Sequence, residues 1–142
     1  MTCDLCEQSG GELIWRNARC RAVLVDDRDY PGFCRVIWQT HVREMTDLSS
    51  EDRAHFMAIV FTVEESLRET MNPDKINLAS LGNMMPHLHW HVIPRFVHDR
   101  HFPGPIWGQA QRESTDRANT NGLAETLRTA LLARLSPCHL AS

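Results

Sequence analysis

Three histidines alternate with large apolar residues in NMMPHLHWHVIPR, the stretch that covers residues 83–95. Side chains two residues apart share one face of a β-strand, so His87, His89 and His91 are predicted to form a row, with neighbours about 6 to 7 Å apart. The intervening apolar side chains would point the other way, into a core. A proline near each end of the row disfavours a helix.

Such a row has three interpretations. Imidazoles bind zinc readily, so the three could be metal ligands. They could also supply a nucleophile with two helpers. A coincidence of composition is the third interpretation. It is the weakest, because the alternation, the apolar partners and the closing Ile-Pro-Arg occur together.

The elements around the row predict a single α+β arrangement. Extended segments are expected at 12–16, 19–26, 33–39, 76–82 and 87–93. A Ser-Ser-Glu-Asp cap begins a long amphipathic helix near residue 49 or 50, and Asn72-Pro73 ends it. This order predicts an antiparallel sheet of about five strands with one long helix packed on it.

The C-terminal part has a different character. Residues 96–109 are too rich in proline and glycine for regular structure, and residues 114–122 are polar. Leucines at four-residue steps then predict an amphipathic helix over 123–135. We therefore divide the chain into a domain at 1–110 and, at 111–142, a polar linker with a C-terminal helix.

Composition excludes some functions. The net charge of −3, with His counted as neutral, argues against nucleic acid as a partner, which usually requires a basic surface. No apolar run approaches the roughly 20 residues that span a bilayer, so we expect no membrane association. The N-terminus lacks a signal-peptide core, which predicts a cytoplasmic protein. Five cysteines, an odd number, suit reduced thiols.

The row resembles the signature of the histidine-triad (HIT) family, His-φ-His-φ-His-φ-φ with φ apolar. The Pro94-Arg95 that follows resembles the family's continuation. The stretch GFCRVIWQTH, residues 32–41, resembles the family strand that ends in a histidine before the long helix. The resemblance covers about residues 3–107 and implies a HIT-like fold.

The resemblance also implies a reaction. A neutral imidazole attacks the α-phosphorus of a nucleotide, and water then hydrolyses the nucleotidyl-histidine. By position His89 is the nucleophile, His87 orients it, and His91 contacts the phosphate or the leaving group. A nucleotidyl-transferase branch has glutamine at the third position, so His91 favours hydrolysis. The expected substrate is a dinucleoside polyphosphate or a nucleoside phosphoramidate, and no cofactor is required for catalysis.

Other positions would bind the nucleotide. Asp26 or Asp27 resembles the family's ribose-binding acid, and the alternative is that both cap a strand in solvent. Asn83 stands where most relatives carry a phosphate-contacting glutamine, and Asn77 is a further candidate contact. Leu24 and Ile37 are candidates for the slot that holds the base, and the alternative is that both are ordinary core residues.

Some HIT relatives hold a structural zinc with an N-terminal C-x-x-C, the histidine after the strand and the first triad histidine. The matching residues are Cys3, Cys6, His41 and His87, a set that suits tetrahedral zinc. The alternative is a free surface dithiol. Zinc bound here would fix the N-terminus beside the active strand and would not be the catalyst.

Two further functions remain as alternatives to the hydrolase. One is a metal-binding protein that uses the triad itself as ligands, and the other is a nucleotide-binding sensor with little catalysis. The expected partner is a small nucleotide. The resemblance also implies a homodimer.

Overall fold

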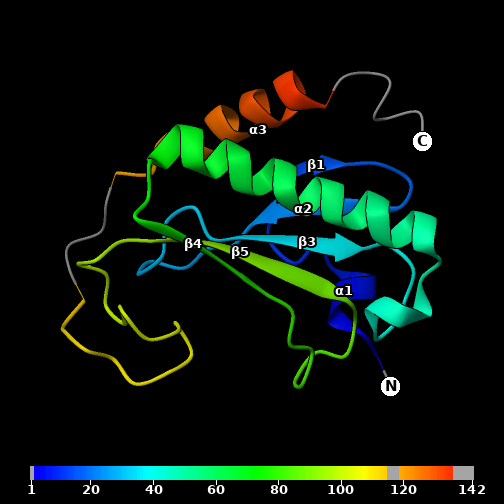
Figure 1. The fold of residues 1–142 in the computed structure, drawn as a ribbon, viewed down its shortest axis with the longest axis horizontal. Coiled ribbons are helices and arrows are strands. Elements are labelled where there is room, and N and C mark those ends of the chain that lie inside the picture. The colour runs from blue at the N-terminus through cyan, green and yellow to red at the C-terminus, as the bar shows by residue number, and fades with distance from the viewer. Residues whose placement is uncertain (1, 115–118, 136–142) are drawn as a thin grey trace.

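A five-stranded antiparallel sheet forms the centre of the molecule in the computed structural model, which describes residues 2–114 and 119–135 (Figure 1). The strands are β1 (Glu12–Arg16), β2 (Cys20–Leu24), β3 (Cys34–Trp38), β4 (Lys75–Ala79) and β5 (His89–Arg95). Their order in the sheet is β1-β2-β3-β5-β4. The α+β prediction with about five strands is therefore confirmed.

Two helices lie along the sheet (Figure 1). The long helix α2 (Ser50–Met71) begins where the Ser49 hydroxyl accepts a hydrogen bond from the Asp52 amide. It ends at Asn72, whose left-handed φ of 48° closes the last turn before Pro73. The C-terminal helix α3 (Leu123–Arg134) packs against α2 and β1.

The hydrophobic core lies between the helices and one face of the sheet. Strand side chains facing α2 include Ala22, Cys34, Val36, Trp38 and Val92. Helix α3 contributes Leu127 and Leu131 to the same core, and Leu135, the residue after the helix, joins them. Burial of each leucine side chain stabilises the fold by about 1.5–3 kcal/mol. These leucines therefore hold the C-terminal segment against the sheet and α2. Residues 115–118 and 136–142 of the predicted second segment lie outside the described residues.

The opposite face of the sheet, here called the histidine face, carries His89 and His91. The strand pairing places Ile37 beside His89 and Arg35 beside His91. An N-terminal segment with the short helix α1 (Asp4–Glu7) packs on the same face, where Leu5 contacts Val23 and Ile37. The sequence patterns did not predict α1, because four residues are too short for a periodic signal.

Arg21 holds the N-terminal segment in place. This buried side chain donates hydrogen bonds to the carbonyls of Leu5, Gln8 and Ser9 and to the side chain of Gln39. The carbonyls belong to the end of α1 and the turn after it, so the guanidinium substitutes for missing backbone donors. A strand residue thereby fixes the position of the C-x-x-C pair.

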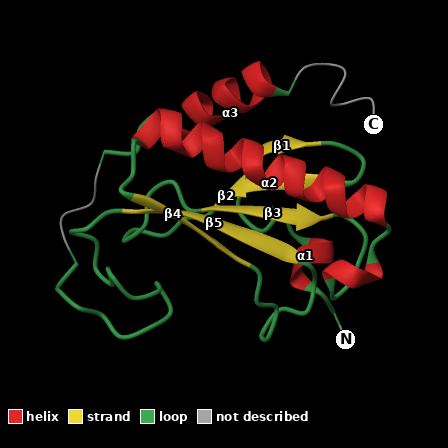
Figure 2. Cartoon of the chain, in the orientation of Figure 1, coloured by secondary structure: helices red, strands yellow, loops and turns green. Residues whose placement is uncertain are grey.

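Residues 96–114 form loops without a helix or strand, as their composition predicted (Figure 2). The loops are held by Arg95, which is 2% exposed and binds both carboxylate oxygens of Asp99 at 2.8 and 3.0 Å. Arg95 also donates to the Asn77 side chain and to the Gly104 carbonyl. Within the described ranges, no helix is long and apolar enough to cross a membrane.

Candidate active site

His89 is the first residue of β5, and a backbone carbonyl two residues earlier fixes the orientation of its ring. Nδ1 lies 2.6 Å from the His87 carbonyl, so Nδ1–H donates and the lone pair is left on Nε2. Burial lowers the pKa of His89, the bond to the carbonyl opposes this, and the charge of Arg35 lowers it further. The result is a neutral imidazole with a free nitrogen, the form that a nucleophile requires.

His91 stands beside this ring. The two ring centroids are 4.8 Å apart at an interplanar angle of 88°. Burial, with the nearby His89 and Arg35, lowers the pKa of His91 to about 3, so this ring is also neutral. Its Nδ1 is buried and has no hydrogen-bond partner in the described structure. The ring centroids of Phe33 and Trp107 lie 5.5 and 5.0 Å from the centroid of the His91 ring.

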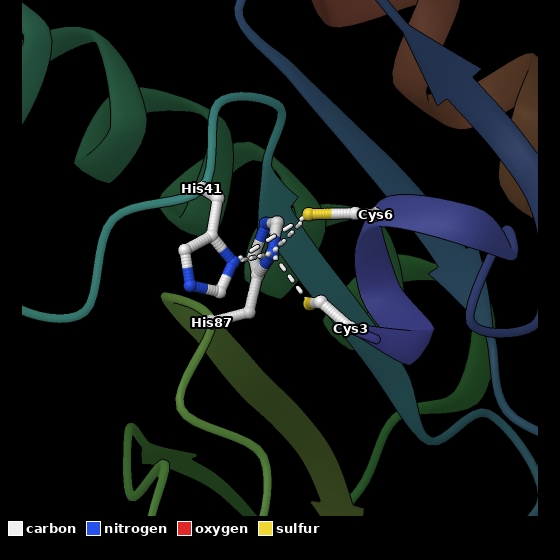
Figure 3. A group of neighbouring side chains, drawn as sticks. All are labelled: Cys3, Cys6, His41 and His87. Carbon is white, nitrogen blue, oxygen red and sulfur yellow. Dashed lines mark hydrogen bonds between the residues drawn. The ribbon is translucent and has the colours of Figure 1, made fainter. Parts of the chain in front are cut away.

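His87 precedes β5, so only two of the three histidines belong to the strand that the sequence predicted for all of them. The His87 amide donates to the Met85 carbonyl in place of a strand partner, and Leu88 bonds to Val42 and Trp38 outside the regular ladder. The His87 ring donates from Nε2 to the Trp38 carbonyl at 2.6 Å. Its Nδ1 faces the two cysteines instead of the His89 ring (Figure 3).

The four predicted zinc ligands lie together (Figure 3). Nδ1 of His87 is 3.3 Å from Cys3 Sγ, 3.4 Å from Cys6 Sγ and 3.2 Å from Nδ1 of His41. All four donor atoms lie within 4.8 Å of one another. In the described residues this is the one group of three or more metal-binding side chains, so the triad itself is not assembled as a ligand set.

The predicted ribose acids line a cavity that the triad histidines do not line. Asp26 and Asp27 follow β2 and line a cavity of about 650 Å³ between the ends of β1 and β2 and the start of α3. None of the triad residues lines that cavity. Asp27 accepts a hydrogen bond from the Asp29 amide, which makes it a turn-forming residue as well.

The two asparagines occupy different environments. Asn77 lies on β4, pairs in register with Ile93, and accepts a hydrogen bond from Arg95. It therefore connects the sheet to the Arg95–Asp99 pair. Asn83 is exposed in the loop before the row. A cavity of about 280 Å³ beside this loop is lined by Gly82, His87 and His89.

Neither candidate for the base slot is open on the histidine face. Leu24 pairs with Cys34 and packs with it in the core under α2, so it lies on the other face of the sheet. Ile37 lies on the correct face but is fully buried by Leu5 of the N-terminal segment. Ile37 is a core residue, which was its alternative interpretation, whereas Leu24 is partly buried and also lines the cavity that Asp26 and Asp27 line.

Three site residues were not predicted from the sequence. Arg35 lies on β3 opposite His91, and a charged residue inside the apolar strand CRVIW was the available signal. The Ser80 hydroxyl donates to the His89 carbonyl at 2.7 Å. Trp107, half exposed, reaches His91 only because the loops of residues 96–114 fold back, and no local pattern indicated this.

Comparison with known proteins places this geometry in a family. A family model described as the HIT domain matches residues 7–98. The chain belongs to the HIT family. This membership supports a nucleotide-binding, hydrolase-type function with small nucleotides as ligands. A comparison with curated proteins found no match.

Solved structures of HIT proteins have the same fold. A histidine triad protein from Bradyrhizobium japonicum is 27% identical, with a TM-score of 0.75 over 87% of this chain and 92% of that one. One from Marinobacter aquaeolei VT8 is 25% identical, with a TM-score of 0.76 over 96% and 98%. A protein named as a Zn-bound histidine triad family member, from Mycobacterium smegmatis, is 24% identical, with a TM-score of 0.66 over 95% and 96%.

Proposed function

We propose that this HIT protein is a nucleotide hydrolase that cleaves at an α-phosphate through a covalent nucleotidyl-His89 intermediate. The hydrogen bond from His89 Nδ1 to the His87 carbonyl carries the proposal. It selects the tautomer whose Nε2 lone pair can attack phosphorus, and it orients the ring without help from another side chain.

The reaction proceeds in two steps. Nε2 of His89 attacks the α-phosphorus, the N–P bond forms, and the bond from phosphorus to the leaving group breaks with its electron pair on the leaving group. Water then attacks the same phosphorus, the N–P bond breaks, and the nucleoside monophosphate is released with His89 neutral again. The substrate is a dinucleoside polyphosphate or a nucleoside phosphoramidate.

His91 supports the transfer as a neutral hydrogen-bonding group beside the nucleophile. A neutral imidazole carries one N–H donor, and its buried ring sits edge-on to His89. A prepositioned donor of this kind stabilises charge that develops on phosphate oxygens. Asn83, in the loop before the row, is proposed as a second phosphate contact, and Asp26 or Asp27 as the ribose acid.

The experiment is to trap the intermediate. Protein mixed with an α-³²P-labelled dinucleoside polyphosphate and quenched early should carry acid-labile label on His89, located by peptide mass spectrometry. His89→Ala should carry none. His98→Ala is the matched control, since His98 is an exposed histidine in the loops outside the row, and should label like the wild type. Label on a residue other than His89 would contradict the proposed chemistry.

We also propose a structural zinc held by Cys3, Cys6, His41 and His87. Zinc bonds of about 2.3 Å to sulfur and 2.0–2.1 Å to nitrogen imply tetrahedral donor separations of about 3.3–3.8 Å, and the four closest pairs here are 3.2–3.5 Å apart. The Nε2–H of His87 is already bonded to a backbone carbonyl, which leaves Nδ1 bare, as in metal-ligating histidines. Bound zinc would join the N-terminal segment to the loop before β5 and would take no part in the bond changes.

A homodimer is the proposed assembly. Strands β1 and β4 end the sheet, so each has one edge without a strand partner among the described elements. An open edge can pair with a second chain. Light scattering during gel filtration should give twice the chain mass of 16.3 kDa, and a mass of one chain would contradict the proposal.

A further inference from the structure

Arg35 is a cation on the histidine face, and it has no role in the two reaction steps proposed above. Strand pairing places it directly opposite His91, and cross-strand neighbours on one face have Cβ atoms about 4.5–5.5 Å apart. Both residues contact the same ring: the Arg35 guanidinium carbon lies 5.7 Å from the centroid of Phe33, and the His91 ring lies 5.5 Å from it.

The hydrogen-bonding capacity of Arg35 is largely unused. In the described part of the chain its one hydrogen bond runs from Nη1 to the Gly10 carbonyl at 3.2 Å, and its Nε is buried without a partner. A guanidinium has five N–H donors, and leaving them unpaired in a partly buried site is costly. The Arg35 guanidinium therefore has donors available for an acceptor that a ligand supplies.

The other cations on this face are already engaged. Arg21 is bonded to backbone carbonyls, and Arg95 is neutralised by Asp99. Lys75, exposed on the edge strand β4, donates to the Ile76 carbonyl. No carboxylate occupies a strand position on the histidine face in β2 to β5, where the positions are Arg21, Val23, Arg35, Ile37, Lys75, Asn77, Ala79, His89, His91, Ile93 and Arg95. The charge of Arg35 thus acts on the reacting groups without a strand carboxylate to offset it, and it lowers the pKa of both His89 and His91.

We infer that Arg35 selects substrates with an anionic leaving group, which makes the dinucleoside polyphosphate the preferred class. The inference rests on the proposed hydrolase function. When a phosphoanhydride breaks, the electron pair stays on a phosphate oxygen, and the growing negative charge is attracted to the guanidinium. When a phosphoramidate breaks, the departing nitrogen takes the electron pair and a proton from water and leaves as a neutral amine, so no negative charge develops on it for the guanidinium to attract. One residue thereby distinguishes the two substrate classes that the triad alone accepts.

The test compares two substrates with one nucleoside, diadenosine triphosphate and adenosine phosphoramidate, with the guanosine pair run in parallel. The measured quantity is the ratio of their kcat/KM values. Arg35→Met keeps a long side chain over Phe33 and removes the charge. Hydrogen bonds to charged groups contribute about 1.5–3 kcal/mol, so we expect this variant to lower the ratio by about 10- to 100-fold. Arg35→Lys, which keeps the charge, should retain part of the preference.

Lys75→Met is the matched control, because it removes one positive charge from the same face at its exposed edge. Its ratio should equal that of the wild type. A ratio that changes less than twofold in Arg35→Met, or a wild type that prefers the phosphoramidate, overturns the inference while the hydrolase function stands. If the wild type cleaves neither substrate and forms no labelled His89, the proposed function and this inference both fail. Thermal melting of each variant separates loss of selectivity from loss of fold.

Discussion

Removal of the Asp99 carboxylate is expected to be one of the most destabilising single changes in this protein. Asp99 binds Arg95 through both oxygens and also accepts hydrogen bonds from the amides of Phe96, His101 and Phe102. Arg95 is 2% exposed, so Asp99→Ala leaves a guanidinium charge buried without its counter-ion. Removing one partner of a buried pair costs about 3–5 kcal/mol. This is a large share of the roughly 5–15 kcal/mol by which domains are stable.

Urea unfolding followed by far-UV circular dichroism measures this cost. Asp74→Ala is the control, since Asp74 binds the same loops through one exposed hydrogen bond, to the Val97 amide, and its loss should cost about 0.5–1.5 kcal/mol. A double variant, Arg95→Met with Asp99→Ala, removes both charges and should be more stable than the sum of its single changes allows. The reasoning is refuted if Asp99→Ala lies within 1 kcal/mol of the wild type, or if the double variant is strictly additive.

The same pair predicts a pH dependence. Burial by itself raises the pKa of Asp99, but the hydrogen bonds from Arg95 and from the Phe96 and Phe102 amides outweigh it and lower the pKa from 3.8 to about 2. A lowered carboxyl pKa stabilises the fold at pH values above the unfolded pKa, here by about 2 kcal/mol. That contribution is lost as the pH falls from about 4 to about 2. The wild type should therefore lose more stability than Asp99→Ala over this range.

The other predictions concern the site. His89→Ala should abolish turnover and leave nucleotide binding largely intact, because a nucleophile acts in the transition state; steady-state kinetics and calorimetry measure the two, and near wild-type turnover would be contrary evidence. His91→Ala should cost less, about 10²- to 10³-fold in rate, because it removes one prepositioned donor. His41→Ala should reduce stability more than the chemical step, and elemental analysis should find about one zinc per chain in the wild type; protein purified without chelator and free of zinc would remove the metal site. Adenosine or guanosine monophosphate at 100 times its dissociation constant should add about 2.7 kcal/mol of stability, and unchanged melting at millimolar nucleotide would count against a nucleotide site.

The parts of the fold that could be predicted are those with a local signal. The cap at Ser49 and the break at Asn72-Pro73 act on neighbouring residues, so the bounds of α2 follow from short-range chemistry. The leucines of the C-terminal segment recur at four-residue steps, and the structure buries Leu127, Leu131 and Leu135 as that spacing requires. The alternation of the row likewise placed His89 and His91 on one face of a strand.

Other features depend on which segments meet. Leu24 was a candidate for the base slot, and the structure packs its side chain against the core under α2, because the face of a strand residue is defined by its pairing partner and by what covers the sheet. His87 left the strand because its ring bonds to the Trp38 carbonyl and to the cysteine cluster, 49 and more residues away in sequence. Such contacts carry no local pattern.

The sequence by itself therefore determined the strands, the helices α2 and α3, the spacing of the histidines and the set of zinc-binding side chain types, since each follows from short-range periodicity or from residue chemistry. Only the tertiary structure decided which nitrogen of His89 is free, because the acceptor that fixes it is a backbone carbonyl whose position depends on the irregular entry to β5. It also decided that Arg35 lies opposite His91 with its Nε unpaired and that the Trp107 ring contacts the His91 ring. Strand pairing and loop folding bring these groups together, and the free energy of both comes from contacts between distant parts of the chain.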